Sequence, residues 1–85
     1  MKRYRIYTEE KNLADLKKLV GIRFDGFTIF YTKGSWKGQE ENSLVFEILS
    51  NEPETAIIEL CEAIKDFNSQ ESVYLTHEPV SAVLI

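Results

Sequence analysis

The segment from Thr32 to Asn42 contains the residues of this chain that are best suited to bind a small polar molecule. Its sequence is TKGSWKGQEEN, and Trp36 is the only tryptophan among 85 residues. An aromatic ring in a polar segment can stack on a nucleobase or another flat group. Gly34 and Gly38 allow the backbone to adopt positive φ values or to approach a ligand closely. These residues predict a binding loop. An equally weighted alternative is that Trp36 packs over its own sheet while the glycines serve a turn.

Polar side chains near Trp36 have the hydrogen-bonding groups that a nucleotide-type ligand requires. Lys33 and Lys37 could meet phosphate. Glu41 and Ser43 are two residues apart, so they share one face if a strand begins early. Together with Gln70 they could contact sugar hydroxyls or a base edge. The alternative is a structural Glu–Gln–Ser network that fixes the base of the loop.

Catalytic and metal-binding patterns are weak in this chain. His77 is the only histidine, and Glu78 follows it. An enzyme would need His77 beside Glu41 or Glu78 in one cleft, where the carboxylate would orient a general base. No nucleophile or ligand spacing supports a triad or a metal site, and Cys61 fits a small buried hydrophobe on a helix. We therefore expect a non-catalytic protein with no metal and no cofactor.

The charge distribution bears on the kind of ligand. The net charge is −4, but residues 1–25 hold seven Lys/Arg against four Asp/Glu, while residues 51–85 hold one against seven. An acidic chain makes nucleic acid an unlikely partner. A small anion could still bind near Arg3, Arg5 and Lys37. No signal peptide and no apolar stretch of roughly 20 residues is present, which predicts a cytoplasmic protein that has no membrane partner.

The first strand explains why cationic and aromatic residues could share a surface. Tyr4, Ile6 and Thr8 alternate with polar positions, which predicts a half-buried strand over residues 2–8. Its second face carries the other three residues: Arg3, Arg5 and Tyr7.

The remaining elements follow from apolar periodicity and turn residues. Helices are predicted at 13–20, after an Asn12 N-cap and up to Gly21, and at 53–68. The segment 32–42 is too long for a tight hairpin turn. Pro79 lacks a backbone N–H, so residues 77–79 should interrupt pairing. The other strands are predicted at 27–31, 43–49, 72–76 and 80–85.

This order predicts a single α+β domain over residues 1–85. A βαββαβ chain with an extra C-terminal strand folds most simply as a ferredoxin-like sandwich, an antiparallel sheet with both helices on one face. Right-handed crossovers place the first and third strands at the centre. The second sheet face would then be uncovered in a monomer, which favours a homo-oligomer or a bound partner.

Three motifs resemble those of a family of small uncharacterised bacterial proteins. They are Gly34-x-Trp36, Glu41-x-Ser43 and Phe67-x-x-Gln70-x-Ser72-Val73, within residues 26–75. The resemblance implies a ferredoxin-like or PII-like fold and a joint role for Trp36, Glu41, Ser43 and Gln70. The family brings no established activity, and this chain lacks the secretion signal that many members have.

These observations predict a protein that binds a nucleotide-type molecule, such as ADP-ribose or a cyclic nucleotide, and sequesters it. In size and acidity the chain is similar to phage anti-defence proteins that sequester nucleotide immune signals. The alternatives are a protein-interaction module or inhibitor that uses segment 32–42 and the open face, and RNA binding on that face. The expected ligand contacts are Arg3, Arg5, Tyr7, Tyr31, Gly34, Trp36, Lys37, Glu41, Ser43 and Gln70.

Overall fold

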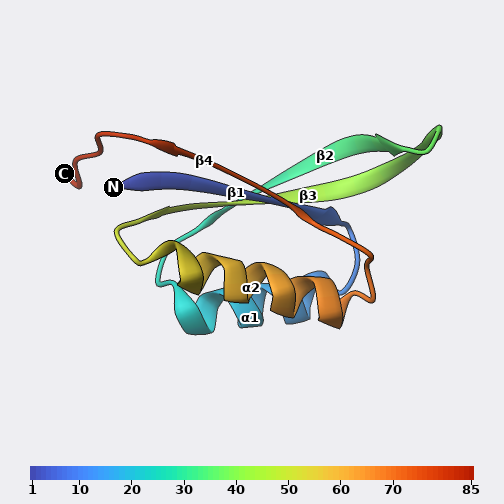
Figure 1. Ribbon diagram of the computed structural model, residues 1–85, viewed down its shortest axis with the longest axis horizontal. Helices are drawn as coiled ribbons and strands as arrows, with labels where there is room; N and C mark the ends of the chain where they lie inside the picture. Colours follow the sequence, from blue (N-terminus) through green and yellow to red (C-terminus); the bar gives the residue numbers. More distant parts are fainter.

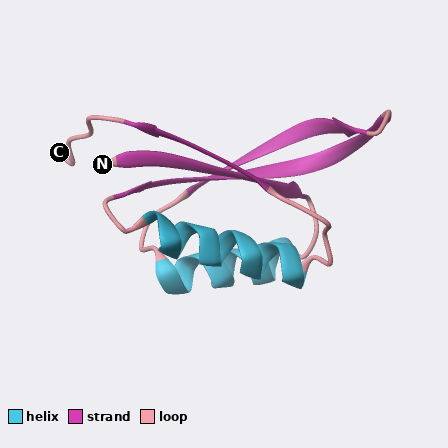
Figure 2. Ribbon diagram, in the orientation of Figure 1, coloured by secondary structure: helices cyan, strands magenta, loops and turns pink.

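A computed structural model describes residues 1–85 and shows a four-stranded antiparallel sheet with two helices on one face (Figures 1 and 2). The βαββαβ order confirms the predicted ferredoxin-like α+β fold. The elements are β1 (Lys2–Glu9), α1 (Leu13–Arg23), β2 (Thr28–Trp36), β3 (Gln39–Ser50), α2 (Glu54–Phe67) and β4 (Tyr74–Pro79).

The sheet order is β2-β3-β1-β4, so the first and third strands are central, as predicted. Alternation along β1 turns Tyr4, Ile6 and Thr8 toward the helices, and all three are buried. In the register with β3, Ile6 pairs with Phe46, which is also buried. The opposite face of the sheet has no helix over it and is called the open face below.

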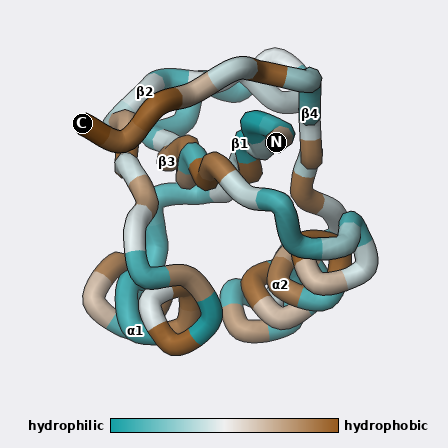
Figure 3. Tube along the Cα trace, turned by 90° about the vertical axis from the view of Figure 1, so that its left-hand side faces the viewer, coloured by the Kyte–Doolittle hydropathy of each residue, from teal (hydrophilic) through white to brown (hydrophobic).

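The core lies between the sheet and the two helices, which Figure 3 shows side by side beneath the strands. The apolar stripe of α2 contributes Ile57, Leu60 and Ile64, which are fully buried. Leu16 and Val20 of α1 complete the contact with the sheet. Burying this stripe is the main stabilising contribution of each helix. Neither helix is long and apolar enough to cross a membrane.

The prediction of a loop over residues 32–42 is wrong, because this segment forms the end of a long β-hairpin. Pairing between β2 and β3 continues to Trp36 and Gln39, which leaves a two-residue turn. Lys37 has φ 52° and Gly38 has φ 79°, as a type I′ turn requires. The hairpin projects beyond the ends of the helices (Figure 1). Both of its faces meet solvent there, so the apolar alternation that identifies a strand is lost.

The predicted final strand over residues 80–85 is also wrong. Instead, β4 continues through His77 and Glu78 to Pro79. Because β4 is an edge strand of the sheet, it tolerates a residue that has no backbone N–H. Beyond it, the backbone N–H of Val80 donates to the carbonyl of Met1 (3.1 Å), and no further strand forms.

The helix boundaries differ slightly from the sequence prediction. Gly21 does not end α1, which continues to Arg23 before the chain turns into Phe24. Asn12 precedes the helix as predicted, but its side chain makes no cap. Its amide instead donates to Asn68 Oδ1 (3.0 Å) and links the start of α1 to the end of α2.

Candidate functional site

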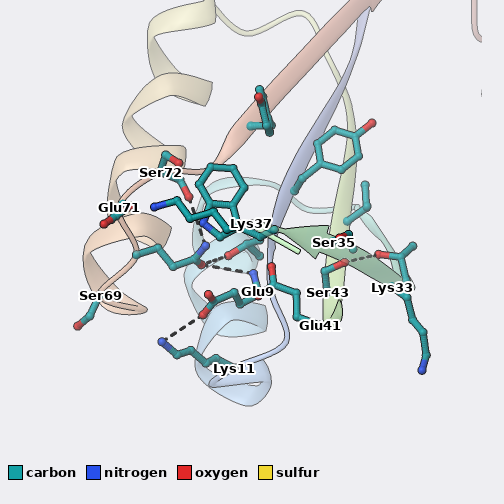
Figure 4. Close-up of a pocket in the computed structure, with 18 residues that line it drawn as sticks. Glu9, Lys11, Lys33, Ser35, Lys37, Glu41, Ser43, Ser69, Glu71 and Ser72 are labelled. Atoms are coloured by element: carbon teal, nitrogen blue, oxygen red, sulfur yellow. Dashed lines mark hydrogen bonds and ion pairs between the residues drawn. The ribbon is translucent and has the colours of Figure 1, made fainter. Parts of the chain in front are cut away.

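A groove of about 540 Å³ lies where the hairpin meets the end of β1 and the segment 69–72 that follows α2 (Figure 4). This volume is within the range of small-molecule sites. The groove is called the hairpin groove below. It is lined by Tyr7, Thr8, Glu9, Lys11, Thr32, Lys33, Gly34, Ser35, Trp36, Lys37, Glu41, Ser43, Val45, Ser69, Gln70, Glu71, Ser72 and Tyr74.

Strand register explains why residues distant in sequence meet on this surface. Tyr7 of β1 is opposite Val45 of β3 on one side and Tyr74 of β4 on the other. Ser43, two residues before Val45, is opposite Thr32 of β2. Because side chains alternate along each strand, all of these residues face away from the helices.

Trp36 lies at the last paired position of β2 and lines the groove with 47% of its surface exposed. Lys37 Nζ is 5.7 Å from the centre of its ring, which is cation–π distance. No apolar core extends this far along the hairpin, so the indole has no buried position available. Trp36 therefore presents an aromatic surface to the groove.

Glu41 is opposite Gly34 in the hairpin register. Gly34 has no side chain that could cover Glu41. The carboxylate of Glu41 is half-buried and makes no hydrogen bond or ion pair within the chain. A Cβ on Gly34 would lie 3.6 Å from Ser43 Oγ, which is ordinary contact. Ser43 Oγ itself is 2.7 Å from Thr32 Oγ1. Gly34 thus keeps the space beside Ser43, opposite Glu41 in the register, open.

Gln70 has a structural role at one end of the groove. Its Oε1 accepts hydrogen bonds from Thr8 Oγ1 and from Asn68 Nδ2 (3.2 Å). Its Nε2 donates to the carbonyl of Ser72 (3.3 Å). Asn68 is buried, so these bonds satisfy a polar group inside the fold and attach segment 69–72 to β1. The predicted network of Gln70 with Glu41 and Ser43 does not form.

Arg3 and Arg5 lie on the open face but outside the groove. Arg5 Nη2 is 2.9 Å from Glu47 Oε1, and Arg3 Nε is 3.2 Å from the same oxygen. Arg3 also pairs with Glu78 (3.1 Å). The hydrogen bond with Glu47 raises the pKa of Arg5 above its ordinary value. Both guanidinium groups therefore already have carboxylate partners.

Tyr31 also lies outside the groove. It pairs with the buried Leu44, which places it on the helix-facing side of β2, and it is 61% exposed. Of the ten predicted contacts, the structure brings seven together in the groove: Tyr7, Gly34, Trp36, Lys37, Glu41, Ser43 and Gln70.

The arrangement that the enzymatic alternative would need is not present. His77 Nε2 is 2.9 Å from Glu54 Oε1 at the start of α2, and its ring is 5.9 Å from that of Tyr4. His77 thus points to the helix side, whereas Glu41 lines the groove on the other side. Glu78 alternates to the open face and pairs with Arg3.

Several groove residues were missed from the sequence. Tyr74 and Glu71 come from segments that meet the hairpin only through the sheet order. Tyr74 could have been found from the antiparallel register, which places it beside Tyr7. Glu9 and Lys11 form an ion pair (3.2 Å) at the end of β1. No local motif distinguishes these two residues from ordinary charged residues on the surface.

Comparisons with known proteins identify structures with a similar fold, but they identify no sequence family. No protein-family model and no curated protein sequence matches this chain. Among solved structures, a DUF3240 family protein from Shewanella baltica OS155 is similar with a TM-score of 0.73 and 14% identity, over 99% of this chain and 96% of that one.

Two further structures have names that mention a ligand or an activity. A phage SAM lyase in its apo state has a TM-score of 0.72 and 21% identity, over 91% of this chain and 78% of that one. CPII, a nitrogen regulatory PII-like protein from Thiomonas intermedia K12 bound to ADP, AMP and bicarbonate, has a TM-score of 0.68 and 18% identity, over 98% and 94%. At these identities the comparisons confirm the expected ferredoxin-like, PII-like fold, and they extend no further than the fold.

Proposed function

We propose that this protein binds a nucleotide-type small molecule in the hairpin groove and holds it without chemical change. The observation that carries the proposal is the half-exposed Trp36 on the wall of a groove of about 540 Å³. Stacking on an aromatic side chain contributes about 1–3 kcal/mol per base. A site of this kind accepts any flat base and gains selectivity from the polar groups around it.

The rest of the groove supplies those polar groups. Ser43 and Thr32 offer hydroxyls from the hairpin, and Ser72 offers a hydroxyl from the segment after α2. Tyr7 and Tyr74 add aromatic surface at the base. Together with Trp36, these groups suit a nucleoside, whose flat base and hydroxyl-rich sugar need both kinds of contact.

The similar solved structures support an adenosine-based ligand. CPII is named as bound to ADP and AMP, GlnK of B. subtilis is named as an ATP complex, and the phage enzyme is named for SAM. All four molecules contain adenosine. We assign the same class of ligand to this chain, and we propose sequestration in place of turnover because the only histidine, His77, pairs with Glu54 on the other side of the sheet from the groove. A role in a phage and a cytoplasmic location remain predictions from the sequence.

The open face of the sheet is a candidate surface for self-association. Phe30 and Leu49 are exposed on it at 42% and 45%, near the Arg3–Arg5–Glu47 cluster. A sheet face with apolar residues and no helix over it is a surface that oligomers commonly bury. We propose that a second copy of this chain covers it and narrows the open side of the groove.

Calorimetric titration with adenosine, ADP, ADP-ribose and cyclic dinucleotides tests ligand binding. We expect Trp36→Ala to weaken binding at least about tenfold, because it removes the stacking surface. Tyr31→Ala is the matched control, since Tyr31 is an exposed aromatic on the other side of the same strand. Equal losses in both variants, or no binding of any adenosine compound, would refute the proposal.

A protein-interaction module is the second candidate, because the exposed Phe30 and Leu49 could contact a different protein. A stoichiometric complex that excludes self-association and is lost on Leu49→Glu would favour this alternative. Unchanged partner binding in Trp36→Ala would separate it from a role of the groove.

A further inference from the structure

We propose that the ligand of the hairpin groove carries a positive charge, as a sulfonium nucleoside does, in place of a chain of phosphates. This inference rests on the proposed function and specifies the ligand class. It follows from the charged groups that the groove leaves unpaired.

The cations that line the groove are mostly occupied. Lys11 Nζ pairs with Glu9 Oε2 (3.2 Å) and donates to the carbonyl of Asn68 (2.7 Å). Lys33 Nζ is 3.3 Å from Glu40 Oε1. Lys37 alone has no carboxylate partner, and it lies against the Trp36 ring. Lys37 is therefore the one lysine of the groove that has no carboxylate partner within the chain, although the Lys33–Glu40 pair is exposed and weak.

The carboxylates show the opposite pattern. Glu41 and Glu71 both line the groove, and neither makes an ion pair or hydrogen bond within the chain. Glu41 is half-buried beside the gap left by Gly34. Glu71 is exposed, so the half-buried Glu41 is the carboxylate of the groove that most favours a cation.

A phosphate chain would be poorly accommodated here. It would bring two or more negative charges toward the half-buried Glu41, and like charges repel most strongly where water is partly excluded. The arginines that could offset this repulsion are held by Glu47 and Glu78 outside the groove. No first-turn residue of α1 or α2 lines the groove, so neither helix N-terminus supplies backbone donors for phosphate in their place.

A cationic centre fits the same surroundings. The face of an indole ring attracts cations, and Lys37 Nζ already lies 5.7 Å from the centre of the Trp36 ring, so the carboxylates are the groups of the groove left for a ligand cation. An unpaired carboxylate on the neighbouring strand adds Coulombic attraction, and Glu41 occupies that position. An adenosine with a sulfonium substituent would place a flat base, a sugar and a positive charge within one molecule.

The test is calorimetric titration of the full chain with four probes: S-adenosylmethionine, S-adenosylhomocysteine, adenosine and ADP-ribose. The first two differ by the sulfonium methyl group and its charge. We expect S-adenosylmethionine to bind at least tenfold more tightly than S-adenosylhomocysteine, and ADP-ribose to bind more weakly than adenosine. Equal affinity for the first pair, or tightest binding of ADP-ribose, would overturn the inference and leave the proposed function intact. Binding of none of the four would overturn both.

A charge-removing variant assigns the effect to one residue. Glu41→Gln keeps the shape and, because Glu41 makes no internal bond, should keep the unfolding temperature. We expect it to weaken binding of S-adenosylmethionine about tenfold and binding of S-adenosylhomocysteine much less. Glu62→Gln, an exposed position on α2, is the matched control. A loss that is the same for both probes would assign Glu41 a role in shape and contradict the charge argument.

Discussion

The roles of several polar residues in this chain depend on contacts between strands that the sequence does not show. The sequence identified Trp36, Glu41 and Ser43 as candidates because an aromatic ring and polar groups occur together. It could not show that Arg3 and Arg5 are held by Glu47, since those contacts cross from β1 to β3. Glu41 and Glu47 look alike in the sequence, but Glu41 lines the groove, whereas Glu47 pairs with Arg3 and Arg5.

Cys61 gives a residue-scale prediction about pH. Burial raises the pKa of its thiol from 9.0 to about 11, because the thiolate is poorly solvated in the core. The unfolded chain ionises first, so this contribution to stability is complete below pH 9 and is lost as pH rises toward 11. We expect the free energy of unfolding to fall over that interval by up to about 2–3 kcal/mol from this group alone.

The measurement is urea unfolding at a series of alkaline pH values. Cys61→Ala removes the thiol and should show a shallower decline, although its stability at neutral pH is lower because a cavity replaces the sulfur. Parallel declines in the two proteins would mean that Cys61 does not ionise differently on unfolding.

The elements that were predicted correctly are those with one buried side. Strand β1 and helix α2 carry regular apolar patterns because each lies against the core on one face. The hairpin beyond the helices has no such constraint, so its polar sequence suggested a loop. Residues 80–85 show the converse: an apolar pattern that favours a strand, but no edge of the sheet that pairs with it.

Two glycines in the hairpin should respond differently to the same substitution. Gly38 has φ 79°, which is costly for residues with a Cβ, so Gly38→Ala should destabilise the fold by about 1 kcal/mol. Gly34→Ala adds a methyl group at ordinary contact distance, so stability should be nearly unchanged. The methyl group enters the groove beside Ser43 Oγ, opposite Glu41 in the register, and should weaken ligand binding.

Thermal unfolding and calorimetric titration of the two variants separate these effects. If Gly34→Ala lowers stability as much as Gly38→Ala and leaves binding intact, the space beside Glu41 is not part of the site.

At the scale of the whole molecule, the uneven charge of the sequence acquires a location. The positive N-terminal segment contributes Arg3 and Arg5 to the open face, and the acidic residues of α2 lie on the opposite layer. The cationic surface is nevertheless partly neutralised, because Glu47 and Glu78 lie within it. Net charge by segment thus misses the ion pairs that neutralise Arg3 and Arg5 on the open face.

Self-association through the open face is the prediction at this scale. Leu49→Glu places a charge on that face, and we expect it to shift the protein from oligomer to monomer in sedimentation velocity. Ile58→Glu is the matched control, because Ile58 is 44% exposed on α2 and Leu49 is 45% exposed. A wild-type protein that sediments as a monomer, or a control that dissociates equally, would exclude the open face as the interface.

Nuclear magnetic resonance can show whether a ligand binds in the hairpin groove. Trp36 is the only tryptophan, so its indole N–H gives a single resolved signal. When an adenosine-based ligand is added, we expect this signal to shift together with the amides of Gly34 and Glu71, while the amides of α1 stay in place. Saturable binding that leaves the Trp36 indole and both amides unmoved would contradict this expectation.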